Sequence, residues 1–282
     1  MKVLVTGSSG QLGKAVADNL KSYHHDVIGI DILPGNHTDA LIDVTEKDAI
    51  EQIVKNTDAI IHTAALHGKH YEMNYAREDF INTNIFGTLN LLNAAVKNGV
   101  SKFLYTSTTS IYGTAMVDDN KAVWVDELLI EQPRDIYDIT KQTAEQLCKD
   151  FFYKEGLQTS VYRVGRFLPE TENLKINHRL YRGLDERDGA EALRLGLLYD
   201  FKDFEIFNIT SGSPFLKEEL TQLKNDPAEI IKAHFPEAAA IYESENWQFP
   251  ESIDRVYVCD KAKQMLGYKP LYTFEYLLNQ FK

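Results

Sequence analysis

The stretch TGSSGQLG, residues 6–13, decides the fold of this 282-residue chain. It follows an apolar run at residues 2–6 that has the composition of a buried strand. After it, residues 11–21 repeat apolar side chains at the spacing of a helix. A glycine-rich turn between a buried strand and a helix is typical of a parallel α/β sheet. We therefore take this turn as the first strand-to-helix connection of such a sheet.

The glycines of this turn, Gly7, Gly10 and Gly13, have the spacing G-x-x-G-x-x-G. In such a turn the first glycine permits a tight bend and the second lets the main chain approach a pyrophosphate. The third lets the helix pack closely on the strand. The turn therefore predicts a dinucleotide-binding site, to which we also assign Ser9, Gln11 and Leu12.

Strand-like and helix-like segments alternate as far as residue 164. The apolar patterns predict further strands at residues 26–30, 40–44, 59–62, 102–106 and 159–164, and long helices at 79–97 and 134–153. Thr45 and Asp48 have the spacing of a capping box, which predicts another helix start. This alternation implies an α/β fold with a doubly wound, parallel (Rossmann) sheet, in which ligands bind beyond the carboxyl ends of the strands.

The second expected strand ends in VIGID, and its last residue, Asp31, lies about 20 residues beyond the glycines. A carboxylate in that place accepts hydrogen bonds from the adenosine ribose and repels a 2′-phosphate. The following residues, DILPGN, contain no Arg or Lys, so the sequence favours NAD over NADP. Asp43, at the end of the third expected strand, is within reach of the adenine, and its neighbour Val44 is included in the site.

Two further motifs carry hydroxyl and amine groups. The stretch YTSTTSIYG, residues 105–113, contains a run of hydroxyl side chains at a strand end, where buried hydroxyls need partners. The stretch YDITK places Tyr137 and Lys141 four residues apart, and hence on one face of a helix. A phenol beside an ammonium has a lowered pKa, which makes it a usable acid–base group.

Together with HTAA at residues 62–65 and NTNIFGTLNLL at 82–92, these motifs resemble the extended short-chain dehydrogenase/reductase family, in its NAD-dependent sugar epimerase/dehydratase group. The resemblance covers residues 1 to about 165 in order. Weaker similarity follows in YRVGRFLPE, GLDERDGAEA and DKAKQMLGYKP, within residues 162–270.

The resemblance implies hydride transfer to NAD. It implies that Tyr137, as a phenolate, takes a proton from a substrate hydroxyl while Thr108 hydrogen-bonds the same oxygen. Lys141 would hold the nicotinamide ribose and lower the pKa of Tyr137. The resemblance also adds residues to the cofactor site, namely Ala64, Ala65, Asn84, Thr106, Ser107, Tyr137, Lys141 and Val164.

Departures from the family pattern bear on the substrate. Thr109 and Ser110 stand where family 4,6-dehydratases carry acidic residues, so dehydration is disfavoured. Arg166 stands where nucleotide-sugar epimerases usually carry Asn, and a guanidinium binds a phosphate or a sugar carboxylate bidentately. The alternative is that Arg166 forms a surface salt bridge. The spacing R-x-G-x-x-x-P-E from Arg163 to Glu170 resembles the uronate-dehydrogenase-like branch, although the Asn-His pair of that branch is missing.

Several basic residues are expected to make the substrate pocket positive. Histidine pairs such as His67 and His70 occur at metal sites, but no third ligand is evident, so we expect no metal and either a substrate-facing loop or simply solvated histidines. The expected substrate residues are His67, Thr108, Thr109, Arg166, Lys175 and Arg255, with further positive charge from His178, Arg179 and Arg182.

Beyond residue 164 the pattern loosens. Residues 182–198 predict a loop followed by a helix, and residues 204–210 predict another strand. We therefore expect an NAD-binding domain at 1–165, with return segments at 187–211. A small substrate lobe is expected to comprise 166–186 and 212–282.

Composition limits the partners. The formal net charge of −12 argues against nucleic-acid binding, and no apolar run approaches a transmembrane span or a signal peptide. Cys148 and Cys259 are expected to be reduced thiols, as in a cytoplasmic protein. By resemblance, the helices near 76–97 and 134–153 predict a homodimer. The predicted function is that of an NAD-dependent oxidoreductase or epimerase acting on a sugar or nucleotide sugar. The alternatives are a uronate-type sugar dehydrogenase that releases NADH and an NAD-binding regulatory protein without turnover.

Overall fold

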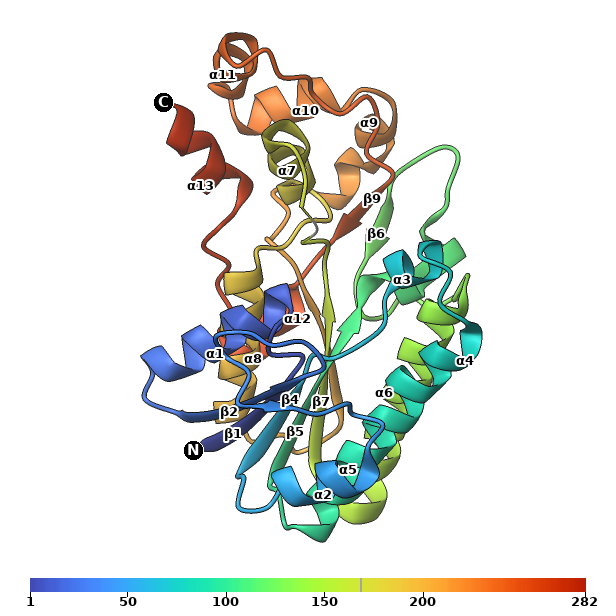
Figure 1. Ribbon diagram of the computed structural model, residues 1–282. Helices are drawn as coiled ribbons and strands as arrows, with labels where there is room; N and C mark the ends of the chain where they lie inside the picture. Colours follow the sequence, from blue (N-terminus) through green and yellow to red (C-terminus); the bar gives the residue numbers. More distant parts are fainter. Residues whose placement is uncertain (168) are drawn as a thin grey trace.

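A computed structural model describes residues 1–167 and 169–282 of the chain. Its centre is a parallel sheet of seven strands in the order β3-β2-β1-β4-β5-β7-β8 (Figure 1). The strands are β1 (Lys2–Thr6), β2 (Asp26–Asp31), β3 (Ala40–Leu41), β4 (Ala59–His62), β5 (Lys102–Thr108), β7 (Gln158–Val164) and β8 (Glu205–Ile209). The order reverses direction at β1, as in a doubly wound sheet, and this confirms the predicted fold class.

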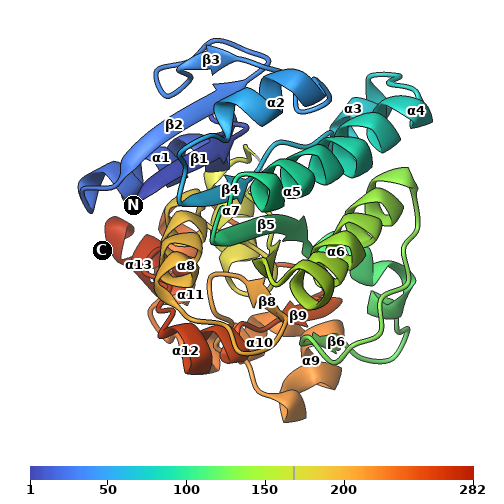
Figure 2. The same cartoon turned by 90° about the horizontal axis from the view of Figure 1, so that it is seen from below.

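Helices cover both faces of the sheet (Figure 2). One face packs against α1 (Gln11–Ser22), α8 (Glu186–Leu198) and α12 (Asp260–Leu266). The other packs against α2 (Lys47–Ile53), α5 (Gly87–Lys97) and α6 (Ile136–Glu155). Because side chains alternate along a strand, Leu104 of β5 enters the first core while Phe103 and Tyr105 enter the second. The same alternation continues into Thr106, Ser107 and Thr108, at the end of the strand.

The long helix predicted at residues 79–97 is a continuous series of turns. It starts as α4 (Arg77–Phe80), passes through the π-helical segment η1 (Ile81–Phe86) and continues as α5. The predicted helix at 134–153 is α6, whose N-cap Asp135 accepts a 2.9 Å hydrogen bond from the main-chain nitrogen of Asp138. The predicted capping box at Thr45 is wrong. The Thr45 hydroxyl bonds to Asp43, and α2 begins after Glu46 without a side-chain cap.

The C-terminal part stands at the carboxyl end of the sheet (Figure 1). A third core joins its helices, and among its members are Ile176, Phe215 and Ile241. The helices are α7 (Glu172–Arg179), α9 (Leu220–Asn225), α10 (Pro227–His234), α11 (Ala238–Ser244) and α13 (Phe274–Leu278). The shorter elements are α3 (Gly68–Glu72) and the 3-10 segments η2 (Thr109–Met116), η3 (Lys217–Glu219) and η4 (Asn279–Phe281).

Two segments lie across the domain division predicted from the sequence. β6 (Val123–Val125) precedes residue 165, yet it pairs in parallel with β9 (Arg255–Tyr257) beside the C-terminal helices. α12, conversely, follows residue 212 and packs on the sheet, where Ala262 and Leu266 join the first core. The part around the sheet and the C-terminal part are therefore in contact, and each contains segments from both sides of the predicted division.

Candidate active site

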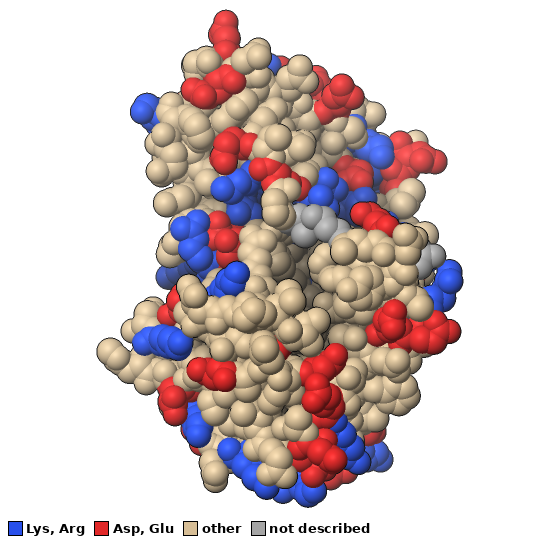
Figure 3. All heavy atoms as spheres, in the orientation of Figure 1, with Lys and Arg blue, Asp and Glu red and all other residues tan. Residues whose placement is uncertain are grey.

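A cavity of about 990 Å³ opens at the carboxyl ends of β1, β2, β4, β5 and β7, where the sheet meets the C-terminal part. Figure 3 shows this face of the molecule hollowed at its middle, with Lys and Arg side chains along the upper rim beside Asp and Glu. The ends of parallel strands are where an α/β sheet binds its ligands. We therefore examine the cavity from its glycine turn to its basic rim.

The first turn is built from glycines that have no room for a side chain. Gly7 has a φ of +71°, and a Cβ on it would lie 2.7 Å from the main-chain nitrogen of Ala64. A Cβ on Gly13 would lie 2.0 Å from the carbonyl oxygen of Gly7. Gly10 is the N-cap of α1 and lines the cavity, so an anion there would meet the positive end of the helix. The tight bend at Gly7 and the close packing at Gly13 agree with the spacing, and the approach of a pyrophosphate to Gly10 stays a prediction.

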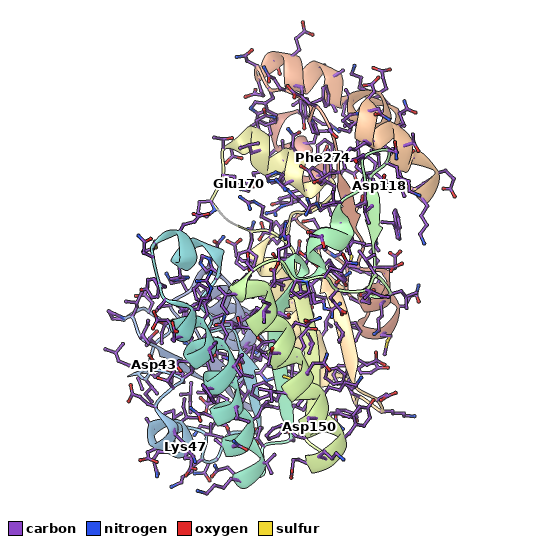
Figure 4. The ribbon with its side chains drawn as sticks, turned by 90° about the vertical axis from the view of Figure 1, so that its right-hand side faces the viewer. Asp43, Lys47, Asp118, Asp150, Glu170 and Phe274 are labelled. Carbon is purple, nitrogen blue, oxygen red and sulfur yellow. The ribbon has the colours of Figure 1, made fainter. Side chains whose placement is uncertain are left out.

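Asp31 lies at the end of β2 and lines the same cavity. One of its carboxylate oxygens accepts a 2.9 Å hydrogen bond from the Ser9 nitrogen, and the other accepts a 2.9 Å bond from the Leu33 nitrogen. Each oxygen has a second lone pair available for a ribose hydroxyl. Asp43 also lines the cavity and is held by the main-chain nitrogen and hydroxyl of Thr45, at 2.8 Å each. It lies on the sheet side of the molecule (Figure 4).

Lys141 is buried against the end of β5. Its ammonium donates a 2.6 Å hydrogen bond to the carbonyl oxygen of Thr106 and lies 4.2 Å from the centre of the Tyr105 ring. Burial lowers the pKa of Lys141 to about 7, although the carboxylate of Glu145 acts in the opposite direction. The amine therefore changes charge near neutral pH, far from the ordinary range of a lysine.

Tyr137 has the opposite shift. Burial raises the pKa of its phenol to about 12, and a hydrogen bond with Thr108 only partly opposes this. The sequence predicted a lowered pKa for Tyr137, so the direction is reversed. The physical reason is that both groups are desolvated and Lys141, itself easily deprotonated, does not offset the burial of the phenol.

The strand end between these groups offers unused hydroxyls. Thr106 and Ser107 are buried and line the cavity, and neither side-chain oxygen has a hydrogen-bond partner. Thr108 accepts a 3.1 Å hydrogen bond from the Ser110 nitrogen, and the Thr109 hydroxyl donates to the Val164 carbonyl at 3.3 Å. A bound molecule with hydroxyl and amide groups would satisfy the two free oxygens. The residues present therefore fit the nicotinamide half of NAD.

Most residues predicted for the cofactor line this cavity, and one does not. Those that do are Gly7, Ser9, Gly10, Gln11, Leu12, Gly13, Asp31, Asp43, Val44, Ala64, Ala65, Thr106, Ser107, Tyr137, Lys141 and Val164. Asn84 is not among the lining residues. Its amide instead bonds to the main-chain nitrogen and oxygen of Leu66 at 2.9 Å each and to the Thr140 hydroxyl at 3.0 Å. Asn84 thus ties the loop after β4 to α6.

The opposite end of the cavity is basic. Arg166 and Arg182 both line it. The main-chain nitrogen of Arg166 donates a 2.9 Å hydrogen bond to the main-chain carbonyl of Arg182, so the two residues lie side by side. Arg166 bonds to Glu170 at 2.5 Å, and Arg182 donates to His178, which contacts Glu170 at 2.7 Å. Burial would raise the pKa of Glu170, but hydrogen bonds from Arg166 and His178 lower it. Figure 4 labels Glu170 on the connection between β7 and α7.

The other expected substrate residues divide between the cavity and the surface. Arg255, His67, Thr108 and Thr109 line the cavity, whereas Lys175, on α7, does not. Arg255 forms a bidentate ion pair with Asp254 at 3.0 and 2.5 Å. The pairing of Arg166 with Glu170 was the alternative left open by the sequence, and it coexists with a position on the cavity wall. Within residues 1–167 and 169–282, no three His, Cys, Asp or Glu side chains gather as a metal site.

Some lining residues were missed by the sequence. Arg134 borders the cavity and donates a 3.2 Å hydrogen bond to Ser110, which also lines it. Tyr257 comes from β9, and its position depends on the pairing of β9 with β6, which no local pattern reveals. Arg134 had a usable signal, because it directly precedes the N-cap of the helix that contains Tyr137.

Comparisons with known proteins indicate the same fold. The model of the "NAD dependent epimerase/dehydratase family" matches residues 3–182. A uronate dehydrogenase of Pseudomonas putida is 28% identical over 181 residues, which cover 62% of this chain and 64% of that protein. The match thus spans less than two thirds of that relative's length.

Two solved structures superpose over nearly the whole chain. A short-chain dehydrogenase/reductase superfamily protein from Agrobacterium tumefaciens, with bound NAD, has a TM-score of 0.73 and 19% identity, covering 99% of this chain and 95% of its own. A UDP-glucose 4-epimerase from Thermotoga maritima, with UDP-glucose, has a TM-score of 0.74 and 22% identity, covering 100% and 97%. The predicted resemblance is confirmed, and the chain belongs to the NAD-dependent epimerase/dehydratase family.

Proposed function

We propose that this protein transfers a hydride between NAD and a hydroxyl-bearing carbon of a sugar or nucleotide sugar that carries an anionic group. NAD is the cofactor of the family, as the sequence predicted. The observation that supports the proposal most directly is one cavity that is lined by Asp31 at one end, by Thr108, Tyr137 and Lys141 in the middle, and by Arg166 at the other.

In this mechanism Tyr137 accepts a proton from the substrate hydroxyl, and Thr108 hydrogen-bonds the same oxygen. Because burial raises the pKa of Tyr137 to about 12, the phenolate needs a positive charge nearby. In this proposal Lys141, one turn further along α6, would supply that charge when it is protonated, and it would also hold the nicotinamide ribose. Bound NAD would supply the acceptor for the hydride that leaves the carbon.

The basic end of the cavity supports an anionic substrate. Arg166 and Arg182 offer guanidinium donors beyond those that Glu170 and His178 occupy. A carboxylate or a phosphate would bind such a pair with charge-assisted hydrogen bonds. Net dehydrogenation of a free sugar acid is the second candidate. It is favoured by the similarity to a uronate dehydrogenase and by the spacing R-x-G-x-x-x-P-E from Arg163 to Glu170.

A substrate panel tests the proposal. The protein is mixed with NAD and, in turn, free uronates and UDP-sugars, while NADH is followed by absorbance and sugar products by chromatography. A dehydrogenase accumulates NADH, and an epimerase converts the sugar without accumulating NADH. Tight NAD binding without conversion of any sugar would reject both candidates and leave the regulatory alternative.

We further infer that the interleaved C-terminal part is a substrate lobe and that the protein is a homodimer. The segment η1 and the helices α5 and α6 expose apolar side chains, including Phe86 of η1 at 52% and Ile139 of α6 at 49% exposure. Burial of such side chains is a usual source of dimer stability.

No helix in the described residues is long and apolar enough to cross a bilayer. Cys148 and Cys259 are both free thiols, which supports a reducing, cytoplasmic setting.

A further inference from the structure

Glu145 is a fully buried carboxylate on the helix that contains Tyr137 and Lys141. The three residues follow at intervals of four along α6, so they share one face of the helix. Glu145 forms a bidentate pair with Arg163 of β7, through bonds of 3.0 Å to Nε and 2.7 Å to Nη2. Glu145 is 0% exposed and Arg163 is 1% exposed. The pair thus lies directly beneath the proposed catalytic groups.

The remaining donors of Arg163 are also used. Its Nη1 donates a 3.0 Å bond to the Tyr112 hydroxyl, which donates to Asn208 at 2.8 Å. Its Nη2 also contacts Glu131, in the loop before α6. In the sheet, Arg163 stands opposite Ser107, between Thr106 and Thr108. The guanidinium therefore ties together α6, the loop before it and the strand end that lines the cavity.

The stability of the fold does not by itself explain why a buried ion pair is present here. Desolvation of two charges is costly, and apolar residues of similar volume are often as stable or more so. The pair instead has a neighbour that benefits from it. The groups that interact with Lys141 are the Tyr105 ring and the Thr106 carbonyl from β5, His62 from β4, and Glu145 and Cys148 from its own helix. Among these groups Glu145 is the carboxylate.

We propose that Glu145, fixed by Arg163, is a positioning residue that keeps Lys141 protonated and fixes the position of α6 along the sheet. The assignment rests on the proposed function only in giving the Lys141 cation a purpose. The position of Glu145, one turn from Lys141, is the geometric basis, since an opposite charge at that separation favours the charged form. The burial that lowers the pKa of Lys141 explains why a counter-charge is needed.

The charge of Lys141 can be measured without turnover. Protein grown with lysine labelled with ¹³C at the ε-carbon is titrated by NMR, and the Lys141 signal is assigned by its loss in Lys141→Arg. In Glu145→Gln, which keeps the shape of the side chain, we expect the midpoint of Lys141 to fall by at least about one pH unit. Glu131→Gln is the matched control, because it removes the other carboxylate that contacts Arg163, one that comes from the loop before α6, and it should leave the midpoint unchanged.

A second variant covers the case in which Glu145→Gln does not fold. Glu145→Met combined with Arg163→Met replaces the fully buried pair by apolar side chains and leaves only the partly exposed Glu131 without its partner. The Lys141 midpoint should again fall, though by less than in Glu145→Gln, because the like charge of Arg163 is removed as well. A folded variant that loses thermal stability while Lys141 titrates as in the wild type would overturn the proposal, because it would show a merely structural pair. Failure of every sugar in the substrate panel would reject the proposed function and leave this titration interpretable.

Discussion

The ammonium of Lys141 donates a 2.6 Å hydrogen bond to the main-chain oxygen of Thr106, and so fixes α6 to the carboxyl end of β5. Thr106 is followed within two residues by Thr108, and Lys141 is preceded by one helical turn by Tyr137. A single hydrogen bond therefore relates the two elements that supply the proposed catalytic groups. Because the acceptor is main chain, no side-chain substitution at position 106 removes it.

Tyr137→Phe should abolish turnover while leaving NAD binding within a fewfold of wild type. The change removes the proton-transferring hydroxyl and little else, and positioned acid–base groups contribute about 100- to 10,000-fold. The rate is measured on whichever sugar the substrate panel identifies, and NAD affinity by calorimetry. Wild-type turnover in Tyr137→Phe would disprove the mechanism.

Asp31 should make NAD bind more tightly than NADP, and Asp31→Ser should lower that preference by at least about tenfold, or roughly 1.4 kcal/mol. The carboxylate repels a 2′-phosphate, and serine does not. Asp39→Asn is the matched control, because Asp39 also accepts a main-chain hydrogen bond, at 2.8 Å from Gly29, but does not line the cavity. Fluorescence titrations with both cofactors give the ratio. A wild-type protein without preference would contradict the expectation.

Arg166→Ala should raise KM for the true substrate by about ten- to a hundredfold, since a charge-assisted contact is worth roughly 1.5–3 kcal/mol. NAD affinity should stay the same. Lys175→Ala provides the comparison, because Lys175 carries the same charge but does not line the cavity. Steady-state kinetics of both variants decide the point. Equal, unchanged kinetics in the two would return Arg166 to a purely structural pairing with Glu170.

Lys141→Met should stabilise the fold below neutral pH. The folded-state pKa of Lys141 is about 7, below the ordinary value of about 10.4 in an unfolded chain, so ionisation of the buried amine destabilises the fold. This penalty is fully present below pH 7 and disappears as pH rises from 7 toward about 10. Thermal unfolding at pH 6 should therefore favour Lys141→Met by up to a few kcal/mol, and the difference should vanish near pH 10.

Another buried lysine provides the control for that experiment. Lys102 donates hydrogen bonds of 2.9 and 2.7 Å to the carbonyls of Leu197 and Tyr199, so Lys102→Met should destabilise the fold. Similar losses in Lys141→Met and Lys102→Met at pH 6 would show that the charge of Lys141 carries no such penalty.

Phe86→Glu should convert the proposed dimer to a monomer, because a carboxylate would replace an apolar side chain that is 52% exposed on the α4–α5 face. Leu198→Glu is the control, since Leu198 is 57% exposed at the end of α8, on the other face of the sheet. Sedimentation velocity measures both. A wild-type protein that sediments as a monomer would reject the dimer.

The central sheet could be predicted from the sequence because buried parallel strands are continuous apolar runs. Each of these runs is followed by a turn with characteristic residues. Gly7, Asp31 and Tyr137 are recognisable because close approach, charge and spacing along one helix are local properties. Their common cavity follows from topology alone, since the carboxyl ends of neighbouring parallel strands meet at one edge.

Long-range packing explains what the sequence did not reveal. Asn84 has the residue type of a ligand-binding amide, but its donors and acceptor are taken by Leu66 and Thr140, which are distant in sequence. Lys175, on α7, has the right charge but does not line the cavity. The raised pKa of Tyr137 depends on burial, which the spacing of Tyr and Lys does not express.

The pairing of β6 with β9 has a consequence for biosynthesis. Val123 stands opposite Arg255, so more than a hundred residues must emerge from the ribosome before the short sheet closes. α12, which covers the sheet itself, is made later still. The cofactor half of the cavity can form early, whereas the wall that contains Arg255 and Tyr257 is completed only after β9 has been synthesised. A chain released too soon would thus present an open nucleotide cleft with no substrate wall.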